Sequence, residues 1–218
     1  MAATTISTDL PTCIHLAGVD GTGKSTQAAL LVDRLRIQNA QVRCVWLRWP
    51  RLFSAPLLAY ARLRGYSWKE TIAGYTHGYW SFGGSWVMSC IYPWLVWVDA
   101  LIYATIYVYA PRLLGQHVVC DRFVIDTLAD LMTALDDENF DLRLPGRLFL
   151  ALLPRTALVI ILDLDFAHAV QRTPELAGDR TWPQRRRHYL SIARHHGFLV
   201  ISTEAPVQLV AQRILSAV

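Results

Sequence analysis

The sequence lacks the cysteine and charge patterns that mark several classes of protein. Its four cysteines are far apart and form no C-x-x-C pair, so they do not indicate a disulfide framework or a zinc site. Three of them lie in apolar, strand-like runs, where packed thiols are expected: Cys13, Cys44 and Cys120. The net charge of +4 suits an anionic ligand but is too small to indicate a nucleic-acid-binding protein.

Metal-ligand spacing is also absent among the seven histidines, and there is no internal repeat or low-complexity tract. The pair His195–His196 ends a predicted helix, where it suits the helix dipole. Residues 1–9 have neither the basic nor the apolar region of a signal peptide, so a cytoplasmic protein is expected. At 218 residues, 53% of them hydrophobic, the chain is expected to form one domain (1–218) with a sizeable core.

What is present is a glycine-rich loop. Residues 18–25 match the phosphate-binding pattern G-x-x-x-x-G-K-[ST] at every fixed position. Glycines let consecutive backbone N–H groups turn toward an anionic oxygen, and a helix after the loop adds the positive end of its dipole. In this pattern Lys24 can reach the β- and γ-phosphates of a nucleotide, and the Ser25 hydroxyl can bind Mg²⁺. The predicted nucleotide-binding residues are Gly18, Val19, Asp20, Gly21, Thr22, Gly23, Lys24, Ser25 and Thr26.

Short apolar runs alternate with helical patterns, which is typical of a parallel sheet flanked by helices. Strands are predicted at 12–17, 42–47, 117–120, 157–162 and 198–202. An apolar stripe directly after the loop predicts a helix: Ala28, Leu31, Val32 and Leu35. Further helices are predicted over about 124–135, 145–153, 183–196 and 206–217. The sequence therefore predicts an α/β fold.

One long segment has almost no charge. From Ser85 to Ala110 the only charged residue is Asp99, and this length could span a bilayer. A central aspartate costs roughly 2.5–3.5 kcal/mol on an insertion scale, which leaves insertion marginal. A single span would also separate the later strands from the glycine-rich loop. A buried core or dimer helix is favoured, while a helix on a membrane surface or facing a partner stays open.

Charged residues follow two of the predicted strands. A carboxylate such as Asp121, at the carboxyl end of a strand beside a phosphate-binding loop, is placed to hold Mg²⁺ or its water shell. Its neighbour Arg122 can bind a phosphate with two hydrogen bonds. Asp163, with Asp165 close behind, competes for the metal at the end of the next strand. A structural ion pair at a strand end is the alternative interpretation.

A basic cluster occupies residues 172–187, interrupted by Gly178 and Pro183, so part of it is expected to be a mobile loop. An arginine-rich lid over phosphates would neutralise charge on a transferring phosphoryl group and exclude water. The cluster also contains Arg185, Arg186 and Arg187, and a solvated helix face accounts for two of these three. Arg172 and Arg180 are therefore the better candidates for the arginine that neutralises the phosphoryl charge.

Taken in order along the chain, these motifs resemble the thymidylate kinase family over nearly the whole sequence. The resemblance rests on the loop with Thr26 and Gln27, Leu47-Arg-Trp-Pro50, Asp-Arg-Phe at 121–123, Leu162-Asp-Leu-Asp165, the lid and Tyr189. It implies a P-loop NTPase three-layer sandwich with a five-stranded parallel sheet, often a homodimer. It also implies an enzyme: an ATP- and Mg²⁺-dependent nucleoside monophosphate kinase, with conversion of dTMP to dTDP in nucleotide biosynthesis favoured.

The resemblance assigns roles to single residues. Asp20 would lie against the acceptor's sugar hydroxyl, and Arg48 and Arg122 would bind its phosphate. Ser25 and Asp121 would hold Mg²⁺. The loop has no arginine at Gly21 or Thr22, a variant that in this family accompanies a lid supplying the catalytic arginine. The catalytic residues would be Lys24, Asp20, Arg122 and Arg180.

In the family, an aromatic residue stacks on the base and an arginine four residues later hydrogen-bonds it. Here these positions fall near Trp97, which could stack on a base, and Leu101, which has no donors to replace the arginine. A different acceptor, such as a nucleoside or another small phosphorylated metabolite, therefore stays open. So does a nucleotide-binding regulatory protein that docks through residues 85–110. Residues 54–110, rich in aromatic side chains, are expected to be a helical elaboration of the domain.

Overall fold

A computed structural model describes residues 11–38, 40–48, 52–72 and 74–218. Five strands form one parallel sheet in the order β2-β5-β1-β6-β7. Their bounds are Cys13–Ala17 (β1), Val42–Val45 (β2), His117–Asp121 (β5), Ala157–Asp163 (β6) and Leu199–Ser202 (β7). The predicted strands and the α/β fold, a five-stranded parallel sheet flanked by helices, are thus confirmed.

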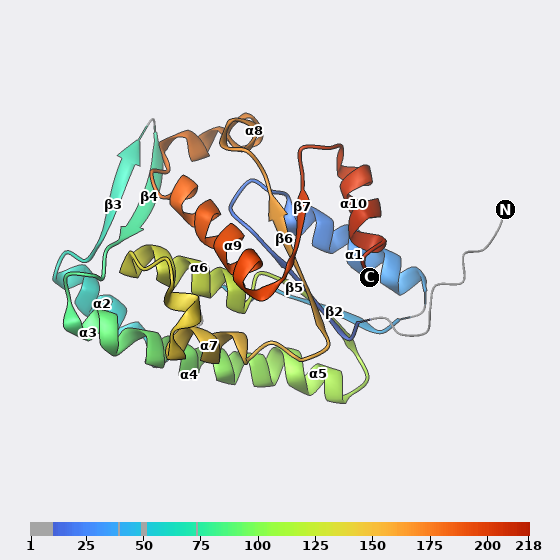
Figure 1. Cartoon of the computed structure of the whole chain (residues 1–218), viewed down its shortest axis with the longest axis horizontal. Coiled ribbons are helices and arrows are strands. Elements are labelled where there is room, and N and C mark those ends of the chain that lie inside the picture. Colours follow the sequence, from blue (N-terminus) through green and yellow to red (C-terminus); the bar gives the residue numbers. More distant parts are fainter. Residues whose placement is uncertain (1–10, 39, 49–51, 73) are drawn as a thin grey trace.

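Helices cover both faces of this sheet (Figure 1). The predicted helices are present, with bounds Lys24–Ile37 (α1), Val124–Leu135 (α6), Leu144–Leu150 (α7), Trp182–His196 (α9) and Val207–Leu215 (α10). The helices α1 and α10 pack on one face, and α6, α7 and α9 pack on the other. Side chains alternate along a strand. In β1, Ile14 and Leu16 therefore pack with α1 and α10, while Cys13 and Ala17 pack on the face covered by α6, α7 and α9.

The order of the strands places the glycine-rich loop at a reversal of the winding. After β1 the chain passes through α1 to β2 at one edge of the sheet, whereas after β6 it passes to β7 at the other edge. Open α/β sheets form a crevice at the carboxyl ends of their strands where the winding reverses. Three short helical elements lie in the connections between these strands. They are η2 (Phe140–Leu142) between β5 and β6, and α8 (Phe166–Arg172) and η3 (Pro174–Gly178) between β6 and β7.

A hairpin corrects the expectation that residues 54–110 form a helical elaboration. It consists of the antiparallel strands β3 (Ser67–Ile72) and β4 (Tyr75–Trp80), between α2 (Ala55–Leu63) and α3 (Trp86–Cys90). The stretch is rich in Trp, Tyr and Thr, which pack well on a pleated surface. Gly74 supplies a φ of +85° at the end of the hairpin. Figure 1 shows the hairpin standing beside the beginning of α9.

The long apolar segment folds as one continuous helix from Trp86 to Leu113. It consists of α3, α4 (Tyr92–Ala104), the π-helical turn η1 (Thr105–Tyr109) and α5 (Ala110–Leu113). By length and composition alone it could cross a membrane, with a mean hydropathy of 1.5 in its most apolar window, of which 39% is buried.

Arg112 lies in the last turn of this helix, and Asp99 is the one charged residue before it. Its carboxylate is fully buried and accepts hydrogen bonds from the backbone N–H groups of Leu52, Phe53 and Ser54 at 2.8–3.0 Å. The Ser54 hydroxyl adds a fourth at 2.6 Å. Because buried N–H groups need acceptors, Asp99 fixes the chain that leads into α2 against α4.

Candidate functional site

Residues 18–23 connect β1 to α1 through three glycines with positive φ: Gly18 (+143°), Gly21 (+89°) and Gly23 (+82°). A Cβ on Gly18 would lie 2.3 Å from the carbonyl oxygen of Leu162, so any side chain there would push the loop away from β6. Thr22 donates its hydroxyl to the carbonyl oxygen of Val19 at 2.9 Å. The loop therefore depends on glycine for its backbone angles and for its close approach to the sheet.

The loop and the first turn of α1 line a cavity of about 650 Å³. Among the described residues no side chain caps α1, which begins after Gly23, so the N–H groups of its first turn have no capping side chain there. Ser25 and Thr26 are exposed in the cavity wall, which also includes Arg122 and Arg172. A helix N-terminus combined with cationic side chains favours an anionic ligand.

Lys24 is buried beside this cavity. Its Nζ donates hydrogen bonds to the carbonyl oxygen of Val19 at 2.6 Å and to Thr22 Oγ1 at 3.4 Å. Burial and the charge of Arg122 lower the pKa of Lys24 to about 8, although Asp20 acts in the opposite direction. An anion in the cavity would favour the protonated form of this side chain.

Three arginines from different parts of the chain meet at the carboxylate of Asp20. Arg122 donates to Oδ1, Nη1 of Arg185 lies 3.3 Å from Oδ2, and Nη1 of Arg48 lies 3.7 Å from Oδ2. Burial alone would raise the pKa of Asp20, but the charges of Arg122, Arg48 and Arg185 outweigh it and hold the pKa well below its ordinary value. Asp20 therefore stays ionised and keeps three guanidinium groups together.

Arg122 reaches Asp20 from an unusual backbone conformation. Its φ is +73°, a region that costs a residue with a side chain roughly 1–2 kcal/mol. Its N–H donates to the carbonyl oxygen of Leu16 at 3.3 Å, and its carbonyl oxygen accepts from the N–H of Leu47 at 3.1 Å. These bonds join the end of β1 to the chain after β2 and stabilise the strained turn, as is common at functional sites.

Sequence reasoning missed the carboxylate that supports Arg122. Asp126 of α6 is fully buried, accepts from the Tyr189 hydroxyl at 2.8 Å and from the Phe123 N–H at 3.1 Å, and lies 3.2 Å from His15 Nε2. Burial would raise its pKa, but the hydrogen bond with His15 and the charge of Arg122 lower it. The only local signal was its position four residues after Arg122.

Arg48 has a second carboxylate partner that the sequence did not indicate. Its Nε lies 3.2 Å from Oδ2 of Asp130 on α6, and this charge raises the pKa of Arg48 above its ordinary value. The rest of the predicted segment after β2, Trp49 and Pro50, lies outside the described residues. Arg48 is thus held between α6 and the glycine-rich loop.

The two competing metal ligands differ in their environment. Asp121 is buried at the end of β5, and its Oδ1 has no hydrogen-bond partner among the described residues. Asp163 instead receives two hydrogen bonds from Arg186 at 2.7 and 2.8 Å, while Asp165 caps α8. Ser25 lines the first cavity, whereas Asp121 is not among the residues that line that cavity or the second one described below. A carboxylate oxygen and a hydroxyl are ligands of the kind that Mg²⁺ prefers.

The predicted lid, residues 172–187, comprises the end of α8, η3 and the first turn of α9. Trp182 is buried and donates Nε1 to the carbonyl oxygen of Asp20 at 2.9 Å, which ties α9 to the loop. The side chain of Arg180 is 71% exposed and pairs with Glu70 of β3 at 2.9 Å. In this structure Arg185, and not Arg180, therefore joins the arginines at Asp20.

Arg172 contacts neither Asp20 nor Glu70 but lies near the chain after β7. Its Nη2 donates to the carbonyl oxygen of Thr203 at 2.6 Å, so Arg172 connects α8 to the chain after β7. Arg187 is exposed on α9, as a solvated helix face requires. Arg185 and Arg186 are paired with carboxylates, so that interpretation applies to one of the three arginines and not to two.

A second cavity, of about 480 Å³, has Asp20 and Arg185 in its wall. The hairpin contributes Tyr75, Thr76, His77 and Gly78 to it. This cavity shares Gly21 and Thr173 with the first one. Two residues predicted near the acceptor lie elsewhere: Trp97 packs against the main core, and Leu101 is exposed on α4.

Comparison with protein-family models gives no match for this chain, and comparison with the curated proteins gives none either. The fold and the site by themselves define a class. The chain is an α/β protein whose parallel sheet carries, at the carboxyl ends of its strands, a glycine-rich loop between two cavities and a carboxylate bound by three arginines.

Proposed function

We propose that this protein is an ATP- and Mg²⁺-dependent nucleoside monophosphate kinase with a P-loop NTPase fold, of thymidylate kinase type, with dTMP as the favoured acceptor. One observation carries the proposal. The two cavities meet at Gly21 and Thr173, with Arg122 in the wall of the first, Arg185 in the wall of the second, and both bound to Asp20. Phosphoryl transfer needs a donor and an acceptor held in line with the charge between them neutralised.

In this proposal the triphosphate of ATP lies in the first cavity against residues 18–26. Lys24 uses two of its three N–H groups on the loop, which leaves the third for a phosphate oxygen. Ser25 and Asp121 would hold Mg²⁺, which when bound neutralises charge on the β- and γ-phosphates. Arg122 lines the same cavity, and in this proposal it would lie beside the transferring group.

The acceptor would occupy the second cavity. Its phosphate would compete with Asp20 for the guanidinium groups of Arg48, Arg122 and Arg185, because a phosphate accepts bidentate hydrogen bonds as a carboxylate does. The freed carboxylate of Asp20 would then accept a hydrogen bond from the sugar hydroxyl. No general base is required, since the acceptor phosphate is already ionised at neutral pH.

Two roles rest on the family resemblance alone. Arg180 would need to leave Glu70 to close on the transferring group, and Trp97 would need to turn out of the core to stack on a base. Arg185 requires no such movement to supply positive charge. We therefore propose Arg185 in addition to Arg180 as a charge-neutralising residue of the lid.

A different acceptor is the second candidate, and the hairpin favours it. Tyr75 and His77 line the second cavity, so side chains of the hairpin would contact whatever part of the acceptor lies beyond its phosphate. Leu101, at the position of the base-reading arginine, is exposed on α4 and offers no donor. Another small phosphorylated metabolite would use the same loop and arginines, whereas a nucleoside, which has no phosphate, would use the loop and Asp20.

The test is coupled turnover with Mg²⁺-ATP and a panel of deoxynucleoside and nucleoside monophosphates. The proposal expects ADP formation that depends on one acceptor and disappears in Lys24→Ala. Replacement of Arg122 by lysine keeps the charge but removes the bidentate contact, so kcat/KM for the acceptor is expected to fall by about 100-fold or more. Turnover no greater than that of Lys24→Ala with every acceptor would refute it.

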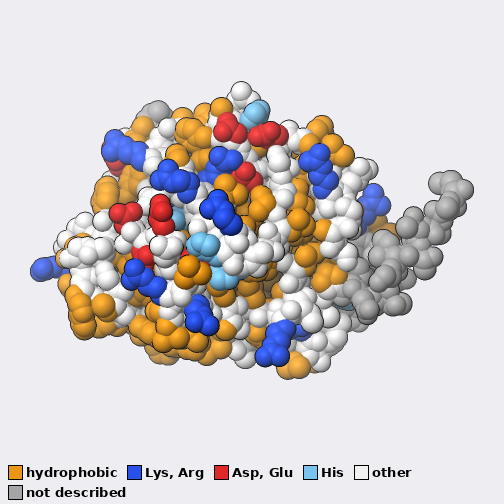
Figure 2. Space-filling model, in the orientation of Figure 1, with side chains coloured by type: hydrophobic (Ala, Val, Ile, Leu, Met, Phe, Trp, Pro, Cys, Tyr) orange, Lys and Arg blue, Asp and Glu red, His pale blue; other side chains and the backbone are white. Residues whose placement is uncertain are grey.

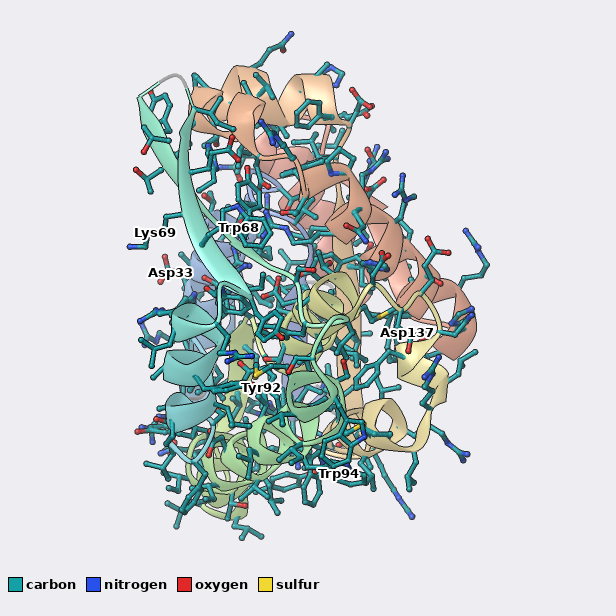
Figure 3. The ribbon with its side chains drawn as sticks, turned by 90° about the vertical axis from the view of Figure 1, so that its left-hand side faces the viewer. Asp33, Trp68, Lys69, Tyr92, Trp94 and Asp137 are labelled. Atoms are coloured by element: carbon teal, nitrogen blue, oxygen red, sulfur yellow. The ribbon has the colours of Figure 1, made fainter. Side chains whose placement is uncertain are left out.

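The oligomer belongs to the same proposal: a cytoplasmic homodimer that pairs through the long apolar helix of residues 85–110. Apolar side chains are exposed along this helix at Trp86, Trp94 and Ile106. Figure 2 shows hydrophobic side chains gathered along the lower edge of the molecule, and Figure 3 shows Trp94 at that edge with Tyr92 turned inward. A regulatory protein that docks on a membrane surface through this helix is the alternative, and recovery with floated vesicles would support it.

A further inference from the structure

We propose a second metal site, for one Zn²⁺ ion, where the end of α9 meets η2. Three ligand groups converge there: the carboxylate of Asp141, Nδ1 of His195 and Nε2 of His196. These atoms all lie within 4.8 Å of one another. The site lies outside the cavities of the proposed kinase centre and does not depend on that function.

The separations are close to those of a coordinated ion. His195 Nδ1 lies 2.8 Å, and His196 Nε2 lies 3.0 Å, from Oδ2 of Asp141. Ligand atoms around tetrahedral zinc, at about 2.0–2.2 Å from the metal, stand roughly 3.3 Å from one another. An ion between them therefore requires the carboxylate and each imidazole to separate by a few tenths of an ångström. Both imidazoles are about a quarter exposed and can rotate to admit it.

The carboxylate is a fixed and incompletely satisfied partner. Asp141 is fully buried, and its Oδ1 has no hydrogen-bond partner among the described residues. Its backbone packs closely on Gly146 of α7, where a Cβ would lie 2.1 Å from the carbonyl oxygen of Phe140 and 2.7 Å from Cα of Asp141. A buried carboxylate with an unused acceptor is costly. A cation at Oδ2 would neutralise its charge, and binding through both oxygens would also satisfy Oδ1.

The donor set favours a transition metal such as Zn²⁺ over Mg²⁺ or Ca²⁺. Two imidazole nitrogens and one carboxylate oxygen are ligands typical of Zn²⁺, whereas Mg²⁺ and Ca²⁺ prefer oxygen alone. Three protein ligands leave a fourth position for water. The ion would fix the end of α9, the helix whose first turns carry Trp182 and Arg185 to the glycine-rich loop.

The test uses the full chain, stripped of metal and titrated with Zn²⁺ by calorimetry and with Co²⁺ by visible absorption. The proposal expects one equivalent of Zn²⁺, a higher Tm when zinc is bound, and a tetrahedral Co²⁺ spectrum. The double variant His195→Gln/His196→Gln is expected to bind zinc at least about 100-fold more weakly. The matched control is His168→Gln, which breaks an exposed pair with Asp165 at 4.0 Å and should bind as the wild type does.

A second variant keeps the result decisive if the double variant folds poorly. Asp141→Asn preserves the volume of the side chain but removes its charge, and it should also lose the Co²⁺ spectrum while its circular dichroism stays native. Equal zinc affinity in the wild type and either variant would overturn the proposal. So would a wild-type chain that binds Co²⁺ without a tetrahedral spectrum, since the three side chains would then form an ion-pair cluster only.

Discussion

Two charged side chains at the glycine-rich loop affect the stability of the fold in opposite directions: the surroundings favour the charge of Asp20 and disfavour that of Lys24. Arginines keep Asp20 ionised, whereas burial makes the protonated form of Lys24 unfavourable and lowers its pKa from 10.5 to about 8. A shift of this size corresponds to about 3 kcal/mol against the charged lysine at neutral pH. That free-energy penalty is present in full below pH 8 and decreases as the pH rises toward the pKa of the unfolded chain.

Replacing Lys24 by methionine is therefore expected to stabilise the ligand-free chain. The gain, reduced by the loss of two hydrogen bonds, should raise Tm by about 2–6 °C. Thermal unfolding with and without Mg²⁺-ATP measures this effect, and the variant should show no shift on adding the nucleotide. Lys69→Met on the exposed face of β3 is the control, and Figure 3 shows that lysine on the outside of the hairpin. A lower Tm for Lys24→Met would contradict the expectation.

The affinity for a triphosphate should depend on pH through the same lysine. Above its pKa of about 8 the free Lys24 loses its proton, but a bound anion favours the charged form and raises that pKa. Binding above pH 8 should thus take up a proton, and Kd should increase by up to about tenfold per pH unit. Calorimetry in buffers of different ionisation enthalpy measures the proton uptake. A Kd independent of pH between about 8 and 10 would be inconsistent with this role.

Between elements, the contact that matters most for the aromatic-rich region is that of α4 with the chain entering α2. Asp99 alone satisfies three backbone N–H groups and one hydroxyl there. The same residue that makes the long helix a poor membrane span thus has a place inside the folded protein. The hairpin is held separately: the Tyr79 hydroxyl donates to the carbonyl oxygen of Gly178 in η3 at 3.0 Å.

Asp99→Ala is expected to reduce the free energy of unfolding by about 2–4 kcal/mol, because it leaves the buried N–H and hydroxyl of Ser54 without this acceptor, together with the part-buried N–H groups of Leu52 and Phe53. Asp99→Asn should have a smaller effect, since its amide oxygen can still accept. Urea denaturation followed by tryptophan fluorescence measures both. Thr105→Ala removes a hydrogen bond at the exposed face of the same helix and should change the stability by no more than about 0.5 kcal/mol. Equal effects of the two alanine variants would disprove the capping role.

For the whole molecule, the exposed apolar face of the long helix predicts self-association. The double variant Trp94→Glu/Ile106→Glu places charges on this face and is expected to convert a dimer into a monomer, because an apolar interface does not tolerate unpaired charge. Light scattering after size exclusion gives the mass. Leu209→Glu, an exposed leucine on α10, is the control and should leave the mass unchanged. A monomeric wild type would remove the homodimer from the proposal.

The order of the sheet also determines which charges meet. Arg48 follows β2, Arg122 follows β5 and Arg185 lies on α9, yet all three reach a carboxylate that follows β1. The strands bring their carboxyl ends to one edge, so residues up to 165 positions apart lie within hydrogen-bond distance. This arrangement accounts for a site at that edge rather than elsewhere on the surface.

Local sequence patterns were sufficient for the five strands, for the helices on both faces and for the glycine-rich loop. Burial on both sides of a parallel sheet imposes continuous apolar runs, helices impose a repeat of 3.6 residues, and a tight loop imposes glycine at positive φ. Each of these signals acts over a few neighbouring residues. The aromatic hairpin was missed because a short apolar stretch without a clear period does not separate strand from helix.

Only the tertiary structure decided which charged groups meet. It placed Arg185 at Asp20 and Arg180 on the hairpin, put Asp126 beneath Arg122, and joined Asp141 to two histidines that follow it by 54 and 55 positions. An ion pair stabilises a fold only at contact distance, and contact between distant segments follows from how the helices pack on the sheet. Apart from the four-residue spacing of Arg122 and Asp126, no spacing along the chain carries that information.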